Sequence, residues 1–297
     1  KNYDNISQVI NNFGSPDIDL NISIFRSSDV VHILGGGYIN AKWKENYCIL
    51  FAASVLKDIS DVKVFTTGLS LFPHEDFFER DIMLSCLNKF DHVSVRDDIS
   101  AELFNIHNYN DDAYLGLQSG LYHVAQGAEF PDVLCCIQNE LADYQMFSHF
   151  VDLTGDYLRK KQQQGKTLGY FEAIPGADSV AYHRLKEKVS DIKFYAFSEL
   201  WTKGFPAKSD TEIISTRFHH HLVGASLGLK GSVLIIDSEY YENKHDSLLS
   251  LNTGWQVINQ QNRDNEIYPS VNVEFKKIAN NLSLDKLRLA QQLYFNE

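Results

Sequence analysis

The chain has 297 residues, of which 44% are hydrophobic, and its formal net charge is −12 at pH 7. This length allows large buried cores and favours two domains over one. The acidic excess would repel a polyanion, so nucleic acid is excluded as a partner and an anionic ligand must be small and held locally.

The sequence shows no segment with the length of a membrane span. The longest nearly apolar run, residues 48–56, is about half of the ~20 residues that a spanning helix needs. The polar start KNYDNISQ is not a signal sequence. We therefore expect a cytoplasmic protein, with peripheral attachment to a membrane left open, and the oligomeric state stays unknown.

The cysteines favour a reducing compartment. Cys48, Cys86 and the adjacent Cys135 and Cys136 lie within apolar patterns, and none fits a CxxC metal spacing. Free cysteine is most often a buried apolar side chain, and disulfides are rare in the cytoplasm. We expect buried thiols and no metal site.

The chain begins with an amphipathic segment around Ile6, Val9, Ile10 and Phe13. Residues 1–28 contain no convincing first strand of a nucleotide-binding domain. The strand and helix pattern therefore starts after them.

The first clear strand covers residues 29–40 and runs into Gly35, Gly36 and Gly37, and a helix is predicted at 43–57. Glycines after a buried strand let the backbone approach a ligand and point free N–H groups at an anion. The turn lacks the GxGxxG spacing of dinucleotide sites and the GK[ST] ending of a P-loop. Anion binding and a plain tight turn both remain open.

A second strand at 61–69 and a helix at 77–90 lead to a third strand, DHVSVRD at 91–97. Its last residues, Arg96 and Asp97, fall at the carboxyl end, where open α/β sheets bind ligands. The alternative is a surface pair that opens the next helix, with Asp97 or the residue after it as the cap.

The pattern becomes irregular at 118–130 and restarts after it, so we place the domain junction there. Strands alternate with helices on both sides, which predicts two α/β domains with parallel sheets. We assign 1–125 to an N-terminal Rossmann-like domain, 126–280 to a C-terminal Rossmann-like domain and 281–297 to a C-terminal helix, with Ser283 as its cap. The second half is expected to contain strands at 130–138, 166–173, 193–196, 211–215 and 233–237 and helices at 146–161, 179–189 and 222–227.

The segment 210–237 packs a strand, a cationic turn, a small-residue helix and a second strand into 28 residues. Arg217 can clamp an anion with a planar fork of donors, and His219 can exchange a proton near neutral pH. Successive helical residues diverge by about 100°, so His220 and His221 are expected to be structural or to support His219. For the same reason three consecutive histidines are a poor ligand set for one metal ion.

Three segments together resemble the polysaccharide pyruvyl transferase family: HILGGGYIN at 32–40, VSVRDDIS at 93–100 and ISTRFHHHLVGASLG at 214–228. The Asp112-Ala113 pair and Lys244, in YENKHDSLL, are further matches, and the similarity extends over residues 29–255. The family usually opens with a strand and an Asn-x-Gly-Asp turn, which has no match in residues 1–28. Either the sequence starts after that turn or this part of the site is absent.

The resemblance implies two Rossmann-like domains that face each other across a cleft, as in glycosyltransferases of the GT-B type. Members of the family move a pyruvyl group from phosphoenolpyruvate onto two hydroxyls of a saccharide or lipid-linked oligosaccharide and form a cyclic ketal. The implied protein is a transferase of exopolysaccharide biosynthesis, with phosphoenolpyruvate as donor and no cofactor. Carried over by motif, the catalytic residues are Arg96, Arg217 and His219, and the substrate contacts are Gly35, Gly36, Gly37 and Lys244.

The chemistry of the donor agrees with these residue types. Phosphoenolpyruvate carries a carboxylate and a phosphate, so Arg96 and Arg217, from opposite domains, are each expected to grip one anionic end. The first step needs a proton on the methylene carbon, and His219 is the best candidate because histidine titrates near neutrality. Lys244 would hold a phosphate or sugar oxygen, although a solvated loop lysine explains it equally well.

Two other functions stay open. One is a GT-B glycosyltransferase that holds a nucleotide sugar with Arg217 and the glycine turn. The other is a non-catalytic descendant that binds an acidic saccharide, which the missing Asn-x-Gly-Asp turn supports. Thermal stabilisation by phosphoenolpyruvate, nucleotide diphosphates or CMP would separate the three functions.

Overall fold

The computed structural model describes residues 25, 27–74, 77–123, 129–140, 143–236 and 240–295. The chain divides into two compact units, unit 1 with Lys1–Asp112 and Asp285–Glu297, and unit 2 with Ala113–Leu284. The amphipathic segment expected around Ile6 to Phe13 lies outside the described residues, and so does Asp237 at the end of a predicted strand.

Unit 1 contains a three-stranded parallel sheet in the order β1-β2-β3. β2 is buried at six of its seven positions, as a central parallel strand is expected to be. The register pairs Val31 with Val64 and Phe65 with His92. The strands are β1 (Val30–Ile33), β2 (Lys63–Leu69) and β3 (His92–Val95), and the helices are η1 (Lys44–Asn46), α3 (Tyr47–Ile59), α4 (Phe77–Leu87) and α5 (Asp98–Phe104).

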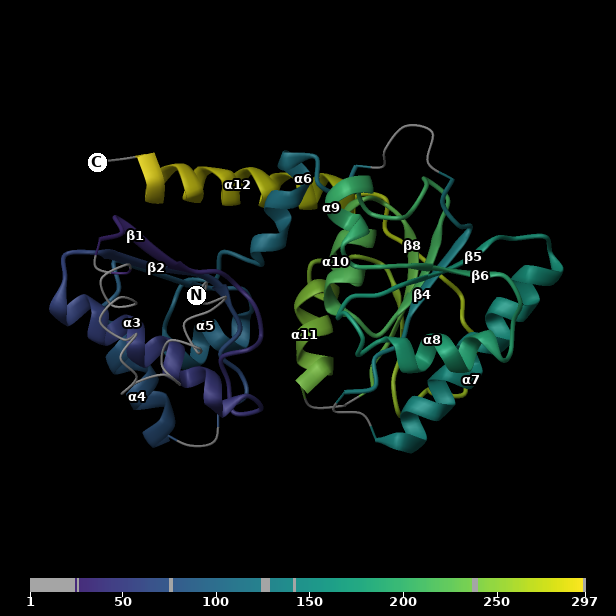
Figure 1. The fold of residues 1–297 in the computed structure, drawn as a ribbon, viewed down its shortest axis with the longest axis horizontal. Helices are drawn as coiled ribbons and strands as arrows, with labels where there is room; N and C mark the ends of the chain where they lie inside the picture. The colour runs from purple at the N-terminus through teal and green to yellow at the C-terminus, as the bar shows by residue number, and fades with distance from the viewer. Residues whose placement is uncertain are drawn as a thin grey trace. The chain divides into compact units, whose positions relative to one another are not determined.

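Helices cover both faces of this sheet. α3 and α4 lie against one face, and the last turns of α12 (Phe275–Phe295) lie against the other (Figure 1). Val64 joins the buried cluster that contains Leu50 of α3 and Met83 of α4. The next residue, Phe65, points to the opposite face, where its ring packs edge-on against Tyr294 at 6.0 Å.

Unit 2 contains a six-stranded sheet in the order β6-β5-β4-β7-β8-β9, and all of its paired strands are parallel. The central strand β4 is buried at all four positions. The strands are β4 (Val133–Cys136), β5 (Leu168–Phe171), β6 (Ile192–Tyr195), β7 (Glu212–Ser215), β8 (Lys230–Leu234) and β9 (Gln256–Ile258). The helices are η2 (Asp112–Tyr114), α6 (Leu115–Ser119), α7 (Tyr144–Gln163), α8 (Ser179–Lys186), α9 (Glu199–Lys203), α10 (Phe218–Ser226) and α11 (Tyr240–Leu249).

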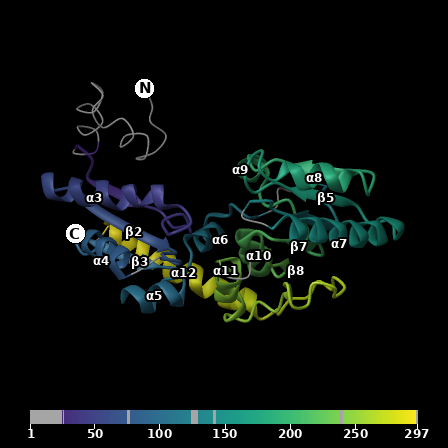
Figure 2. The same cartoon turned by 90° about the horizontal axis from the view of Figure 1, so that it is seen from below.

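Two hydrophobic clusters cover the faces of the larger sheet. One contains Phe150 of α7 and Leu185 of α8, and the other contains Leu222 of α10 and Phe275 at the start of α12. Figure 1 shows α7 and α8 on one side of the strands and α10 and α11 on the other, and Figure 2 shows the same helices from a second direction. Helices on both faces are what an all-parallel sheet requires.

The predicted fold of two parallel-sheet α/β domains is confirmed. Several predicted boundaries are wrong: α10 begins four residues before the predicted helix at 222–227, and α12 begins six residues before the predicted helix at 281–297. β8 begins at Lys230, three residues before the predicted strand, and Ser283 lies inside α12 instead of capping it. The elements α6, α9, α11 and β9 were not predicted. The cleft expected between the domains stays a prediction.

The division of the chain falls at Asp112 and Ala113, ahead of the irregular stretch 118–130 where the junction was predicted. All four cysteines are free. Cys86, Cys135 and Cys136 are buried, which confirms the prediction of buried thiols for three of the four.

Candidate functional site

The residues around position 217 lie at the carboxyl edge of the six-stranded sheet. β7 ends at Ser215, Arg217 follows as the cap residue of α10, and the helix begins at Phe218. The backbone N–H of Arg217 donates to Ser215 Oγ at 3.0 Å. Because the strands are parallel, the loops after β4 and β5 reach the same edge and meet Arg217 there.

Two carboxylates hold the Arg217 guanidinium. Asp178, in the loop after β5, accepts from Nε at 3.1 Å and also contacts a terminal nitrogen. Glu140, in the loop after β4, accepts from the same terminal nitrogen with both oxygens, at 3.0 and 2.9 Å. Asp178 also accepts the N–H groups of Ala173 and Ile174, at 2.8 and 2.9 Å, so it ties its own loop to the arginine.

The two carboxylates differ in exposure. The Asp178 side chain is 0% exposed, whereas the Glu140 side chain is 29% exposed. Burial lowers the pKa of Arg217, but the charge of Asp178, its hydrogen bond and the other nearby anionic groups, Glu140 among them, together raise it by more, so the pKa lies above its ordinary value and the guanidinium stays charged. Asp178 is therefore a fixed partner of Arg217, and Glu140 is the partner that solvent can reach.

Consecutive histidines of α10 point in different directions. His219 is exposed, whereas His220 and His221 are buried. His220 Nδ1 lies 3.0 Å from Ser215 Oγ, and its ring stacks on Phe171 with centroids 4.9 Å apart. The helical turn of about 100° per residue accounts for this divergence. His219 is thus the histidine of the three that can meet a ligand from solvent.

His221 belongs to a buried group behind α10. Its Nδ1 lies 3.2 Å from Nδ1 of His245, its Nε2 lies 2.8 Å from Thr253 Oγ1, and its ring stacks on Trp255. Burial lowers the pKa of His220 to about 3 and that of His245 to about 4, and it lowers the pKa of His221 well below the ordinary value. These three imidazoles are neutral at pH 7 and are unsuited to donate a proton to a substrate.

Three polar residues at this edge were not predicted from the sequence: Gln138, Glu140 and Asp178. The Gln138 side chain is buried, and neither atom of its amide has a hydrogen-bond partner among the described residues. Its backbone N–H donates to Thr216 Oγ1 at 2.8 Å, next to Arg217. Their position in the sequence was the signal that could have identified them, because each of the three follows a buried strand at the carboxyl edge, where ligands bind.

Lys244, a predicted substrate contact, lies in α11 with Nζ 5.1 Å from the centre of the Tyr241 ring. The adjacent His245 places Nε2 3.3 Å from the carbonyl oxygen of Thr216, the residue before Arg217. Lys244 is therefore part of a helix tied to the start of α10, and the alternative of a loop lysine is wrong.

In unit 1, Arg96 follows the last residue of β3 and pairs with Asp111. Its Nη1 lies 2.6 Å from Asp111 Oδ2, and the two side chains are 4% and 7% exposed. Its N–H donates to Leu69 O at 3.0 Å, which continues the pairing of β3 with β2. Asp97 caps α5 by accepting the N–H of Ser100 at 2.8 Å. The predicted cap is confirmed, and the alternative of an exposed Arg96–Asp97 pair is wrong.

The glycine turn after β1 is bonded to its surroundings through its own amides. Gly35 N–H donates to Asp112 Oδ2 at 2.9 Å, and Gly36 N–H donates to Gly68 O at 3.1 Å. A Cβ on Gly35 would lie 2.5 Å from Gly68 O, so glycine alone fits. Asp112 also accepts from Thr67 Oγ1 and Lys286 Nζ, both at 2.7 Å. The turn is a packed junction, and its binding of an anion stays a prediction.

Arg217 and its two carboxylates form one charged cluster at the carboxyl edge of unit 2, and the buried Glu172, directly after β5, lies at the same edge. Within the described ranges, no group of three or more His, Cys, Asp or Glu side chains is arranged to hold a metal ion. Across the same part of the chain, no helix combines the length and the hydropathy that crossing a membrane requires.

Comparisons with known proteins bear on this arrangement. A family model described as polysaccharide pyruvyl transferase matches residues 1–234. No curated protein matches the chain in a sequence search. Among solved structures, a protein from Listeria monocytogenes described as a UDP-N-acetylglucosamine 2-epimerase is similar, with a TM-score of 0.54, 12% sequence identity, and coverage of 97% of this chain and 78% of that one. At this identity the likeness shows the fold alone, two parallel-sheet α/β domains of the GT-B type.

Proposed function

Since this chain belongs to the polysaccharide pyruvyl transferase family, we propose that it transfers a pyruvyl group from phosphoenolpyruvate to two hydroxyls of a saccharide and forms a cyclic ketal. It is a transferase enzyme of polysaccharide biosynthesis. The observation that carries the donor assignment is a charged Arg217 two residues from an exposed His219. An anion clamp next to an acid suits a small donor with a carboxylate and a phosphate.

His219 is the proposed acid. Its imidazolium donates a proton to the methylene carbon of phosphoenolpyruvate, which leaves an oxocarbenium-like centre on the neighbouring carbon. One sugar hydroxyl adds to that carbon, phosphate then leaves with its bonding electrons, and the second hydroxyl adds. One hydroxyl proton returns to His219 and the other leaves with phosphate, so the products are the ketal and inorganic phosphate.

Arg217 is the proposed holder of an anionic group of the donor. A donor oxygen would replace Glu140 on the terminal nitrogen, because Glu140 is the more exposed of the two partners. Asp178 would stay in place and keep the guanidinium aligned. Arg96 is proposed as a second residue that binds the donor, and further substrate contacts are proposed at Gly35, Gly36, Gly37 and Lys244.

Location and product are also part of the proposal. The free, buried thiols of Cys86, Cys135 and Cys136 support a cytoplasmic enzyme. The family supports a saccharide acceptor, and we propose an exopolysaccharide or its lipid-linked precursor.

The test separates donor binding from chemistry. Phosphoenolpyruvate should raise the melting temperature of the wild type and of His219→Ala, but not of Arg217→Ala. With a mixture of acceptor saccharides, phosphate release should fall about 10²-fold to 10⁴-fold in His219→Ala. His183→Ala is the matched control, because His183 is also exposed but lies in α8. Full phosphate release in both site variants would contradict the proposal.

A second candidate is an enzyme that binds a nucleotide sugar. The likeness to a protein described as a UDP-N-acetylglucosamine 2-epimerase favours it, because the two chains share their fold over 97% of this one. Arg217 would then hold the diphosphate. A melting shift with UDP-N-acetylglucosamine and none with phosphoenolpyruvate would select this candidate.

A further inference from the structure

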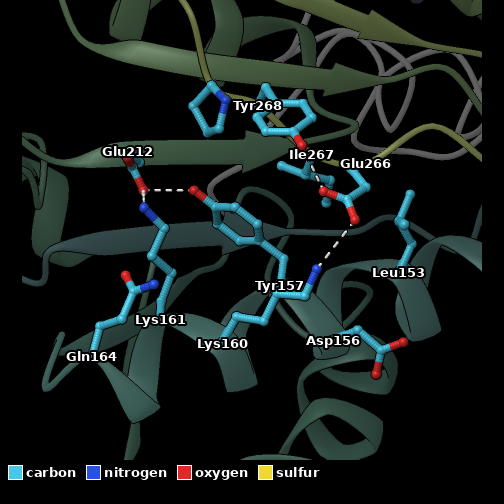
Figure 3. A pocket seen from close by; sticks show the side chains of 11 residues that line it. Leu153, Asp156, Tyr157, Lys160, Lys161, Gln164, Glu212, Glu266, Ile267 and Tyr268 are labelled. Atoms are coloured by element: carbon cyan, nitrogen blue, oxygen red, sulfur yellow. Dashed lines mark hydrogen bonds and ion pairs between the residues drawn. The ribbon is translucent and has the colours of Figure 1, made fainter.

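A pocket of about 310 Å³ lies at the amino edge of the six-stranded sheet in unit 2 (Figure 3). The second half of α7 and its cap residue Gln164 form one wall, and residues 266–269 form the other. Glu212, the first residue of β7, also lines it. β7 runs from this pocket towards Arg217, so the pocket and the proposed active site lie at opposite edges of the sheet.

Two tyrosines give the pocket aromatic surface. Tyr157 lies in its middle with the hydroxyl directed at Glu212, and Tyr268 lies above it (Figure 3). Tyr268 is 66% exposed, so much of its ring is open to a ligand. Leu153 and Ile267 add apolar surface beside the rings. Surface of this kind packs against the C–H face of a sugar ring, as aromatic side chains do with other flat apolar groups.

Polar groups surround the rings in two clusters, each with a glutamate, a tyrosine and a lysine: Glu212 with Tyr157 and Lys161, and Glu266 with Tyr268 and Lys160. The Glu212 carboxylate accepts from its tyrosine at 2.6 Å and pairs with its lysine at 2.5 Å. The Glu266 carboxylate accepts from its tyrosine at 2.7 Å and lies 3.5 Å from its lysine. Paired carboxylates and ammonium groups keep unused lone pairs and N–H bonds, so they can bond to ligand hydroxyls.

The charges of the lining narrow the class of ligand. Three acidic side chains, Asp156, Glu212 and Glu266, and two basic ones, Lys160 and Lys161, give a formal net charge of −1. This balance disfavours phosphate, a nucleotide or phosphoenolpyruvate. A lipid chain is disfavoured because it would take the charges out of water. The class that fits is a neutral ring with hydroxyls around its edge and C–H bonds on its faces.

We propose that this pocket binds one neutral sugar unit of a saccharide chain, apart from the unit that reacts. The proposal rests on the proposed function, which supplies a saccharide acceptor. A polymeric acceptor held at a second place stays at high local concentration, which favours long acceptors over short ones.

Saturation-transfer NMR on the full chain tests this site. The probes are methyl α-D-glucoside, methyl β-D-galactoside and methyl α-D-mannoside at millimolar concentration. At least one should bind the wild type and bind Tyr268→Ala about threefold to tenfold more weakly, as expected for the loss of one stacked ring. Tyr144→Ala is the matched control, because Tyr144 is 74% exposed and begins the same helix outside the pocket. It should bind as the wild type does.

Three results would overturn the site: no saturation transfer to any probe, equal binding by Tyr268→Ala and the wild type, or displacement of the probe by phosphoenolpyruvate. Lys160→Ala gives a second check, since Lys160 is exposed and its loss should also weaken binding without unfolding the chain. The proposed reaction fails separately. If glycoside binding depends on Tyr268 but no phosphate is released from phosphoenolpyruvate, the proposed reaction is contradicted and the proposed sugar-binding pocket is retained.

Discussion

Arg217 pairs with two carboxylates, Asp178 and Glu140, that differ in burial and in their other hydrogen bonds. Asp178 is buried and also bonded to two backbone amides of its loop, so its own loop holds it in position as well as Arg217. Glu140 is more exposed and bonds one terminal nitrogen with both oxygens. At the scale of single residues, Glu140 is therefore the group that the proposed anionic donor would have to displace.

Glu140→Gln should tighten the binding of phosphoenolpyruvate. The amide keeps the shape of the side chain but removes the charge that competes for Arg217. A partly exposed ion pair is worth up to about 1 kcal/mol, so the dissociation constant should fall roughly threefold to fivefold. Titration calorimetry measures it, and Glu129→Gln, at an exposed glutamate of the same unit, should leave it unchanged. Weaker binding by Glu140→Gln would show that Glu140 positions Arg217 instead of competing for it.

Arg217 and His219 could be found in the sequence because they stand in one motif, on a turn between a strand and a helix. The pairing of Arg217 with Asp178 and Glu140 could not be found in this way. Asp178 and Glu140 lie 39 and 77 residues away along the chain, and their pairing arises from the order of strands in the sheet. Long-range contacts of this kind leave no local pattern of charge.

At the scale of elements, a glycine can belong to a strand as well as to a turn. Gly231 lies inside β8, and a Cβ there would lie 2.3 Å from the ring of Trp255. A lone glycine in a sequence suggests a turn or bulge, which explains why β8 was predicted three residues late. The prediction of Ser283 as a helix cap failed for a similar reason. Ser283 lies within α12, and its hydroxyl donates to Tyr114 O at 2.7 Å.

The tight packing of the glycine turn after β1 predicts that a larger residue there destabilises the chain. Gly35→Ala should lower the free energy of unfolding by about 1–3 kcal/mol, because the added carbon meets the Gly68 backbone and the Asp112 carboxylate. Urea unfolding measures this. Gly155→Ala is the control, since there the nearest atom belongs to the flexible Lys188 side chain and alanine favours the helix, so a change of at most about 1 kcal/mol is expected.

Measuring both stability and donor binding in Gly35→Ala separates a packing role of the turn from a binding role. If Gly35→Ala unfolds like the wild type but loses its melting shift with phosphoenolpyruvate, the turn binds the donor through its backbone, as the sequence first suggested. If stability falls and the shift is kept, the glycine is there for the bond to Asp112 and the contact with Gly68.

At the scale of the whole molecule, the end of the chain completes unit 1. Lys286 has a side chain that is 1% exposed, and its Nζ bonds to Asp112, which also holds the glycine turn. The sequence indicated a helix in the tail but gave no sign of this contact, which joins residues 174 positions apart. A buried lysine is costly unless paired, so the pair fixes where the helix lies on unit 1.

Histidines whose pKa is lowered in the folded chain make its stability depend on pH. Burial lowers the pKa of His32 and His92 in unit 1, and in unit 2 it lowers the pKa of His220 to about 3 and of His245 to about 4. In the folded chain the rings of His220 and His245 stay neutral down to about these values, whereas in the unfolded chain they take up protons below pH ~6.5. The unfolded state therefore binds more protons between these values, and stability falls as the pH falls.

The free energy of unfolding should accordingly decrease from pH 7.5 to pH 5, by roughly 2 kcal/mol for His245 alone. Urea unfolding at several pH values gives the slope, which counts the protons taken up. His245→Gln should make the slope shallower by about one proton even if the variant is less stable at every pH, because the slope and not the absolute value carries the result. His183→Ala, which removes an exposed histidine, should keep the wild-type slope. A stability that rises towards pH 5, or an unchanged slope in His245→Gln, would mean that His245 is not held neutral behind α10.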